Sequence, residues 1–189
     1  MLTELAVPAR DSGRIARKLR QSITQPAILA SALFLLLTGI ILAASWHAAE
    51  HHFVYPLDDA YIGMAIAKNL ALHGVWGITP YAFSSADSSI LLPLLLAGAD
   101  RIFGVGTLAP LLFSWLSALA TIFVADRTLR RSLNREQRTV ALIGLVVLTP
   151  LFLGAVLGME HAVHLLLTLL FLEFFFRPAS EPPSPSQLS

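Results

Sequence analysis

The sequence contains no cysteine, and charged residues make up only 13% of its 189 residues. Without cysteine, neither a disulfide framework nor a thiolate metal site can form. A soluble domain carries about a quarter charged residues, whereas 56% of this chain is hydrophobic and its mean hydropathy is +0.70. Long uncharged runs of this kind require a non-aqueous environment, so the composition predicts an integral membrane protein.

The first uncharged run extends from Ala27 to Trp46. At a rise of about 1.5 Å per residue, a helix of this length covers roughly 30 Å, the thickness of one hydrocarbon core. The apolar region of a cleavable signal peptide has only about 7–15 residues, so a retained span is the favoured interpretation. Three further spans are expected at about Thr107–Ala125, at Thr139–Leu157 with a kink at Pro150, and from a polar turn at Gly158–His161 to Phe176.

Lysine and arginine, 13 in total, are unevenly distributed along the chain. Five precede the first span and five fall between residues 127 and 138, but only Lys68 and Arg101 fall between 47 and 105. Cytoplasmic loops carry the excess of these residues. The distribution therefore predicts that both termini and the 127–138 loop are cytoplasmic and that the 47–105 loop lies outside.

The outer loop is expected to contain two amphipathic helices that lie along the membrane surface. Ile62, Ile66 and Leu70 repeat every four residues and are followed by Gly74, a typical helix stop. The apolar run Ser88–Phe103 is short for a span, and a crossing there would move the arginine-rich loop outside. The predicted fold class is therefore an all-α polytopic transmembrane bundle of about four spans with two interfacial helices on the outer face.

This topology divides the chain into three parts. Residues 1–26 form a basic cytoplasmic arm, and residues 27–176 form the transmembrane module with its outer loop at 47–105. Residues 177–189 are rich in proline and serine and are predicted to be a disordered cytoplasmic tail. No nucleotide-binding motif occurs, and no nucleic-acid partner is expected.

The adjacent acids Asp58 and Asp59 open the first outer helix and are the candidate catalytic residues. A carboxylate held in water beside the outer leaflet can serve as a general base. The structural alternative is that Asp58 caps the helix and Asp59 complements its dipole. Spacing alone does not separate these two interpretations.

Three other groups of polar residues are candidates for substrate or metal binding. Ser85 and Ser88 either donate hydrogen bonds to a phosphate or sugar, or belong to a loop and helix cap. Glu160 lies at the outer turn of the last hairpin, where an ionisable residue near the membrane suggests a substrate site. His47 and His51 are four residues apart, so on a helix they would share a face and could bind a divalent cation with the aspartates; the alternative is a cluster of histidine and tryptophan at the membrane interface.

The order of these features resembles a known family across about residues 27–176. Asp58-Asp59-Ala60-Tyr61-Ile62, Lys68-Asn69-Leu70 and Gly74-Val75-Trp76-Gly77 resemble the first extracytoplasmic loop of the GT-C membrane glycosyltransferases. Leu91-Leu92-Pro93-Leu94 and Ile102-Phe103-Gly104 resemble the interfacial helix that follows, and Gly158-Met159-Glu160-His161-Ala162 is similar to a turn found in bacterial members.

The resemblance implies an enzyme of the bacterial cytoplasmic membrane that transfers a sugar from a polyprenyl-phosphate donor to an acceptor hydroxyl. It implies that Asp58, with Asp59 as alternative or partner, deprotonates the acceptor. Glu160 is implied as a pocket residue, and Lys68 and Arg101 are candidate phosphate contacts by charge and location. The expected partners are the lipid-linked donor and membrane lipids.

Family enzymes usually have many more spans, so this chain resembles the N-terminal third of one. It is therefore expected to be a membrane glycosyltransferase, or a truncated or split N-terminal module of one that works with a second membrane subunit. The alternative is a non-catalytic membrane protein that acts as a partner or scaffold. A small transporter is less favoured, because no paired intramembrane charges mark a translocation path.

Overall fold

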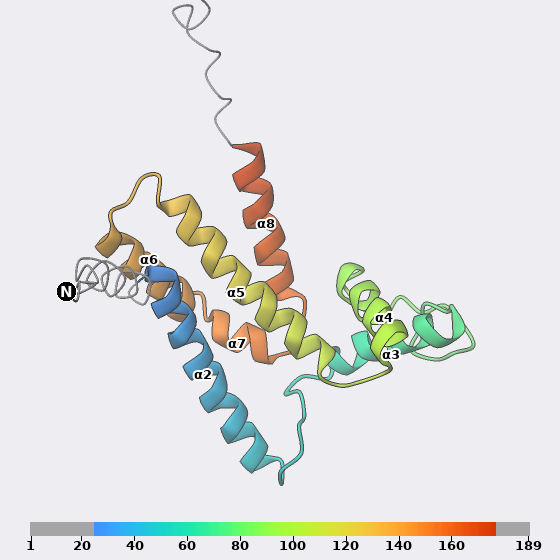
Figure 1. Cartoon of the computed structure of the whole chain (residues 1–189). Helices are drawn as coiled ribbons and strands as arrows, with labels where there is room; N and C mark the ends of the chain where they lie inside the picture. Colours follow the sequence, from blue (N-terminus) through green and yellow to red (C-terminus); the bar gives the residue numbers. More distant parts are fainter. Residues whose placement is uncertain (1–24, 177–189) are drawn as a thin grey trace, which may run out of the picture.

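The computed structural model describes residues 25–176, and within this range every regular element is an α-helix (Figure 1). This confirms the predicted all-α class for the described part of the chain. The predicted tail at 177–189 and nearly all of the predicted basic arm lie outside the described residues. The helices are α2 (Pro26–Ala48), α3 (Asp59–His73), α4 (Leu91–Phe103), α5 (Ala109–Leu129), α6 (Arg135–Leu148), α7 (Leu151–Val156) and α8 (His161–Phe175).

Two of these helices, α2 with 23 residues and α5 with 21, are long and apolar enough to cross a membrane. This assignment rests on length and composition alone. A buried helix of a soluble protein and a signal sequence have the same two properties. Large apolar side chains nevertheless lie on the outside of both helices, with Leu36 59% exposed and Leu116 65% exposed. Such exposed apolar surface is expected where lipid or another protein covers a helix.

The four predicted spans are not confirmed as such. The third breaks into α6 and α7 at Thr149 and Pro150, which lie in a turn between the two helices. Proline lacks the backbone N–H that a continuous helix needs, so a full interruption replaces the predicted kink. The fourth corresponds to α8, which is apolar but has only 15 residues.

The core of the bundle lies where α2, α5, α6 and α7 meet, and α8 packs along α5 (Figure 1). Small residues on α2, including Ala27 and Ala30, are fully buried beside Phe34. They recur at helical spacing and allow the neighbouring backbones to approach closely. The remaining core residues are Ala118, Ile122, Leu142, Val146, Leu151, Ala155 and Ala162.

Helices α3 and α4 pack on each other and lie to one side of this bundle (Figure 1). Their shared core contains Ala67, Ala71 and Leu96. The Arg101 guanidinium donates a hydrogen bond to the Ala71 carbonyl oxygen at 3.0 Å and ties the two helices together. As predicted, α3 ends at Gly74, which has the left-handed φ of 71° that glycine adopts readily.

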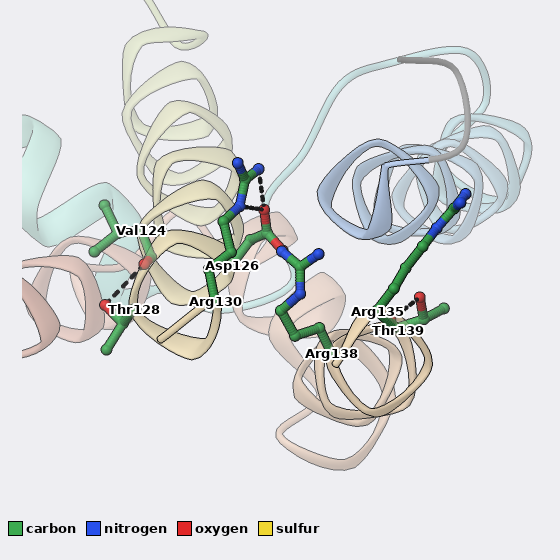
Figure 2. Close-up of polar contacts among 7 residues, drawn as sticks. All are labelled: Val124, Asp126, Thr128, Arg130, Arg135, Arg138 and Thr139. Atoms are coloured by element: carbon green, nitrogen blue, oxygen red, sulfur yellow. Dashed lines mark hydrogen bonds and ion pairs between the residues drawn. The ribbon is translucent and has the colours of Figure 1, made fainter. Parts of the chain in front are cut away.

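The end of the bundle where α5 finishes and α6 begins is held by one buried carboxylate. Asp126 on α5 is 1% exposed and accepts hydrogen bonds from Arg130 at 2.8 and 2.5 Å and from Arg138 of α6 at 2.9 Å. Figure 2 shows both guanidinium groups converging on this carboxylate, whereas the Arg135 side chain points away from it. Arginines of the predicted cytoplasmic loop therefore also fasten α5 to α6.

Candidate active site

A cavity of about 180 Å³ lies between the start of α3, the loop before α4 and the turn between α7 and α8. Three carboxylates from these three segments line it: Asp59, Asp87 and Glu160. Within residues 25–176, no ion pair joins any of the three to a lysine or arginine. The other lining residues are Ala60, Ile62, Gly63, Ala86, Ser88, Leu92, Gly158 and Met159.

The two predicted catalytic aspartates have different positions. Asp59 is the first residue of α3 and lines the cavity, whereas Asp58 does not. Successive residues at the start of a helix point about 100° apart, so the two aspartate side chains leave the backbone in different directions. Asp58 stands at the N-cap position, but its side chain makes no capping hydrogen bond and both aspartates are exposed. The geometry therefore brings Asp59, rather than Asp58, to the other acids.

Asp87 is the cavity residue whose electrostatics are most disturbed. Its Oδ1 accepts a hydrogen bond from the Ser89 backbone N–H at 2.8 Å. Burial raises the pKa of Asp87, and the negative charges of Glu160 and Asp59 raise it further, against the lowering effect of the Ser89 hydrogen bond. The charges of Glu160 and Asp59 thus lie close enough to act on the Asp87 carboxyl.

A glycine on α3 makes room for this carboxyl group. A Cβ atom at Gly63 would lie 3.0 Å from Asp87 Oδ2, tighter than ordinary contact. Gly63 comes one helical turn after Asp59, so both residues present the same side of α3 to the cavity. The Asp87 carboxyl group therefore occupies space that a side chain at position 63 would partly fill.

Tyr55 fixes the segments around the cavity to one another. Its hydroxyl donates a hydrogen bond to the Thr107 carbonyl oxygen at 2.6 Å and accepts one from the Leu111 N–H at 3.1 Å. Its backbone N–H donates to the Tyr61 hydroxyl at 2.8 Å. Burial raises the pKa of Tyr55 to about 12.

The same tyrosine packs against the turn that carries Glu160. Gly158 has φ 70°, and a Cβ atom there would lie only 2.4 Å from the Tyr55 ring. On the other side, the Ser114 hydroxyl of α5 donates to the Met159 carbonyl oxygen at 3.1 Å. Tyr55 and Ser114 thereby hold the Gly158–Glu160 turn beside the first turn of α3.

The remaining predicted site residues are only partly brought together. Ser88 lines the cavity, whereas Ser85 is exposed and does not. Lys68 is exposed on α3 outside the cavity lining. Arg101 is also outside it and contacts Ala71, as described above. Neither cation touches the carboxylates in this arrangement.

The histidines do not assemble a metal site with the aspartates. The rings of His47 and His51 contact each other with centroids 5.5 Å apart, near the end of α2. No group of three or more histidine and acidic residues within the described range is arranged to hold a metal ion. The divalent-cation hypothesis therefore gains no support from the geometry.

A larger, apolar hollow lies at the other end of α4. Its volume is about 580 Å³, and Phe103, Leu108, Leu112 and Leu116 contribute apolar walls. Asp100 lies at its edge; burial raises the pKa of this carboxyl, against a hydrogen bond from the Gly106 backbone. The hollow is separated from the carboxylates by most of the length of α4, which begins beside the cavity at Leu92.

Sequence reasoning missed three contributors to the site: Asp87 as an acid, Gly63 and Tyr55. The four-residue spacing of Asp59 and Gly63 was the only available signal, because a glycine on the face of a catalytic residue indicates close approach. Comparisons of the chain with family models, curated proteins and solved structures found no match.

Proposed function

We propose that this chain is a membrane glycosyltransferase of the GT-C type, or the N-terminal module of one. It would transfer a sugar from a polyprenyl-phosphate donor to an acceptor hydroxyl outside the cytoplasm. The observation that carries this proposal is the cavity in which Asp59, Asp87 and Glu160 converge at one end of an apolar helical bundle. Acids without cationic partners are available for proton transfer.

The proposal includes a topology of four crossings in a bacterial cytoplasmic membrane. α2, α5, the broken pair α6–α7 and α8 form the crossings, and α3 and α4 lie along the outer face. Both ends of the chain would then be cytoplasmic. Arginines at the end of α5 and the start of α6 support this orientation, because basic residues favour the cytoplasmic side.

In the proposed reaction, Asp59 acts as the general base. It accepts the proton of the acceptor hydroxyl while the acceptor oxygen forms a bond to the anomeric carbon of the sugar. The bond between that carbon and the phosphate oxygen breaks, and polyprenyl phosphate leaves with the electron pair. Asp87 and Glu160 would line the acceptor subsite, with hydrogen bonds from Ser88 to the sugar.

The donor requires an apolar surface and a cation in addition to the base. The hollow of about 580 Å³ beside Phe103 and Leu112 has the apolar lining that an isoprenoid chain needs. Lys68 and Arg101 are candidate contacts for the donor phosphate on the same outer layer of helices. The donor would lie along α4 to reach from this hollow to the cavity.

The two adjacent aspartates provide a matched test. Asp59→Asn and Asp58→Asn change the same chemical group at neighbouring exposed positions, but only Asp59 lines the cavity. In membranes supplied with radiolabelled polyprenyl-phosphate pentose or hexose, we expect Asp59→Asn to reduce transfer by about 10²–10⁴-fold. Asp58→Asn should retain transfer near the wild-type rate. Wild-type transfer by Asp59→Asn would reject the assigned base.

A second candidate function is a non-catalytic subunit of a larger membrane assembly. The surfaces of α2 and α5 favour it, because Leu36, Ile40, Leu112 and Leu116 are more than half exposed and could pack on another multispan protein. This candidate predicts stable co-purification with such a protein and no transfer by the isolated chain. Transfer by the purified chain alone would exclude a purely structural role.

A further inference from the structure

A cluster of one glutamate and two arginines lies where α5 and α8 end, at the opposite end of the bundle from the carboxylate cavity. Glu173 of α8 has a side chain that is 13% exposed, and it lies 3.4 Å from Arg127 of α5 and 3.5 Å from Arg131 in the turn that follows α5. The two arginine side chains are 66% and 45% exposed. One carboxylate therefore faces two guanidinium groups, and the group keeps one excess positive charge.

The length of these contacts leaves the arginines available to a further acceptor. Charge-assisted hydrogen bonds from arginine to carboxylate usually measure about 2.7–2.9 Å, and the neighbouring contacts to Asp126 lie between 2.5 and 2.9 Å. Each guanidinium has five N–H donors. Arg127 and Arg131 each use few of these donors on Glu173, and their exposed faces can bind an anion.

Apolar surface lies directly beneath these charges. A hollow of about 430 Å³ between α5 and α8 is lined by Arg131 and Glu173 at its polar rim and by Leu169, Leu172 and Phe176. A smaller hollow of about 170 Å³ lies next to Arg127 and is lined by Leu170 and Phe174. Cations above an apolar groove on a membrane-facing helix match a ligand with a negative head and a hydrocarbon chain.

We propose that the ends of α5 and α8 bind one anionic phospholipid. Its phosphate would contact Arg127 and Arg131, and one acyl chain would lie along Leu169 and Leu172. The excess positive charge selects this occupant, because a zwitterionic lipid would bring its own cation to the two arginines. The inference rests on the proposed membrane insertion and does not depend on sugar transfer.

The experiment measures lipid retention by the full chain. The protein is purified in detergent, supplied with phosphatidylglycerol or phosphatidylcholine, and examined by native mass spectrometry. We expect preferential retention of phosphatidylglycerol, and about 10-fold weaker retention when Arg127→Gln and Arg131→Gln are combined. Glu173→Gln should strengthen retention, because it removes the internal competitor for both arginines.

Two controls separate a specific site from general attraction. Arg135 is at the start of α6, at the same end of the bundle, but it lines neither of the two hollows between α5 and α8. Arg135→Gln removes one positive charge there and should leave lipid retention unchanged. Glycerol phosphate, which has the head without the chain, should fail to displace the lipid at equal concentration. The double variant leaves the Glu173 carboxylate without its two partners and could disturb folding. Adding Glu173→Gln removes that unpaired charge, and this triple variant should fold and still lose selectivity.

Several results would overturn the inference. The first is equal retention of the two lipids, and the second is undiminished retention by the double or triple variant. An equal loss in Arg135→Gln or displacement by glycerol phosphate would also contradict it. So would a wild-type chain that does not fractionate with membranes. The last result would also contradict the proposed transmembrane topology. Lack of lipid selectivity in a membrane-inserted chain would contradict only the proposed lipid site.

Discussion

The two ends of the helical bundle differ in whether their acidic residues have arginine partners. At one end, Asp59, Asp87 and Glu160 share a cavity without a lysine or arginine partner among the described residues. At the other end, Asp126 and Glu173 each face two arginines. The same side-chain chemistry thus produces electrostatic repulsion at one end and neutralisation at the other.

The difference separates residues that hold the fold from residues that can react. The Asp126 carboxylate is occupied by hydrogen bonds from two guanidinium groups that hold helices together, so its oxygens are not open to a substrate. Carboxylates gathered without counter-ions repel one another, which lowers the stability of the fold. Such arrangements are typical of sites where function requires them. This contrast is the physical basis for locating chemistry at the end that contains Asp59.

The largest stability effect is expected from Asp126→Asn. The substitution leaves the largely buried Arg138 guanidinium without its charged partner, and breaking a buried pair costs about 3–5 kcal/mol. Denaturant unfolding in detergent micelles measures this loss. Glu173→Ala is the matched comparison, and it should cost less than about 1 kcal/mol because its partners are exposed. Equal losses in the two variants would contradict the distinction between these carboxylates.

A smaller loss is expected when the brace at the carboxylate end is removed. Tyr55→Phe keeps the ring against Gly158 but deletes the hydroxyl that bonds Thr107 and Leu111. Leaving a buried N–H unpaired costs about 1–3 kcal/mol. Unfolding experiments measure the loss, and the accessibility of Glu160 to carboxyl-modifying reagents should increase. Unchanged stability and accessibility would show that the hydrogen bonds of the Tyr55 hydroxyl do not hold this end of the bundle together.

The smallest effect is a gain of stability in Asp87→Asn. The Asp87 pKa is raised in the folded protein, so folding takes up a proton between the ordinary carboxyl pKa and the raised value. Wild-type stability therefore falls as pH rises through that window. Asp87→Asn avoids this loss and keeps an oxygen acceptor for Ser89, so it should be more stable than wild type at pH 7.

The pH dependence provides the control for this prediction. The advantage of Asp87→Asn should disappear as the pH falls below the ordinary pKa of an aspartate carboxyl, where Asp87 is protonated in both the folded and the unfolded chain. Asp58→Asn makes the same change in net charge outside the cavity and should give a smaller gain at pH 7. A pH-independent advantage of Asp87→Asn would mean that charge repulsion is not its cause.

Local features of the sequence predicted the helices well. Periodic apolar residues and Gly74 defined α3, and the apolar run after Ser88 became α4. The second expected span became α5, which continues past the predicted end at Ala125 to Leu129. That extension places Asp126 and Arg127 inside the helix, where charged residues with partners on other helices are tolerated. Apolar patterning alone did not predict those partners.

The cavity could be predicted only in part, because it depends on contacts between distant segments. Asp59 and Glu160 were separate candidates, and nothing local indicated that Asp87 would join them. Its position depends on the packing of α3 on α4, and its carboxyl group lies in the space beside Gly63. The position of Glu160 likewise requires Tyr55 to pack on Gly158. Such long-range complementarity is fixed by tertiary packing rather than by periodicity.

The most direct test of the account is the side of the membrane on which each end of the bundle lies. Because the chain contains no cysteine, Ser85→Cys and Ser132→Cys each introduce a single exposed thiol, one before α4 and one between α5 and α6. A membrane-impermeant maleimide applied to intact cells should label Ser85→Cys, and it should label Ser132→Cys only after lysis. Labelling of Ser132→Cys but not Ser85→Cys in intact cells would place the three carboxylates in the cytoplasm and contradict the proposed enzyme.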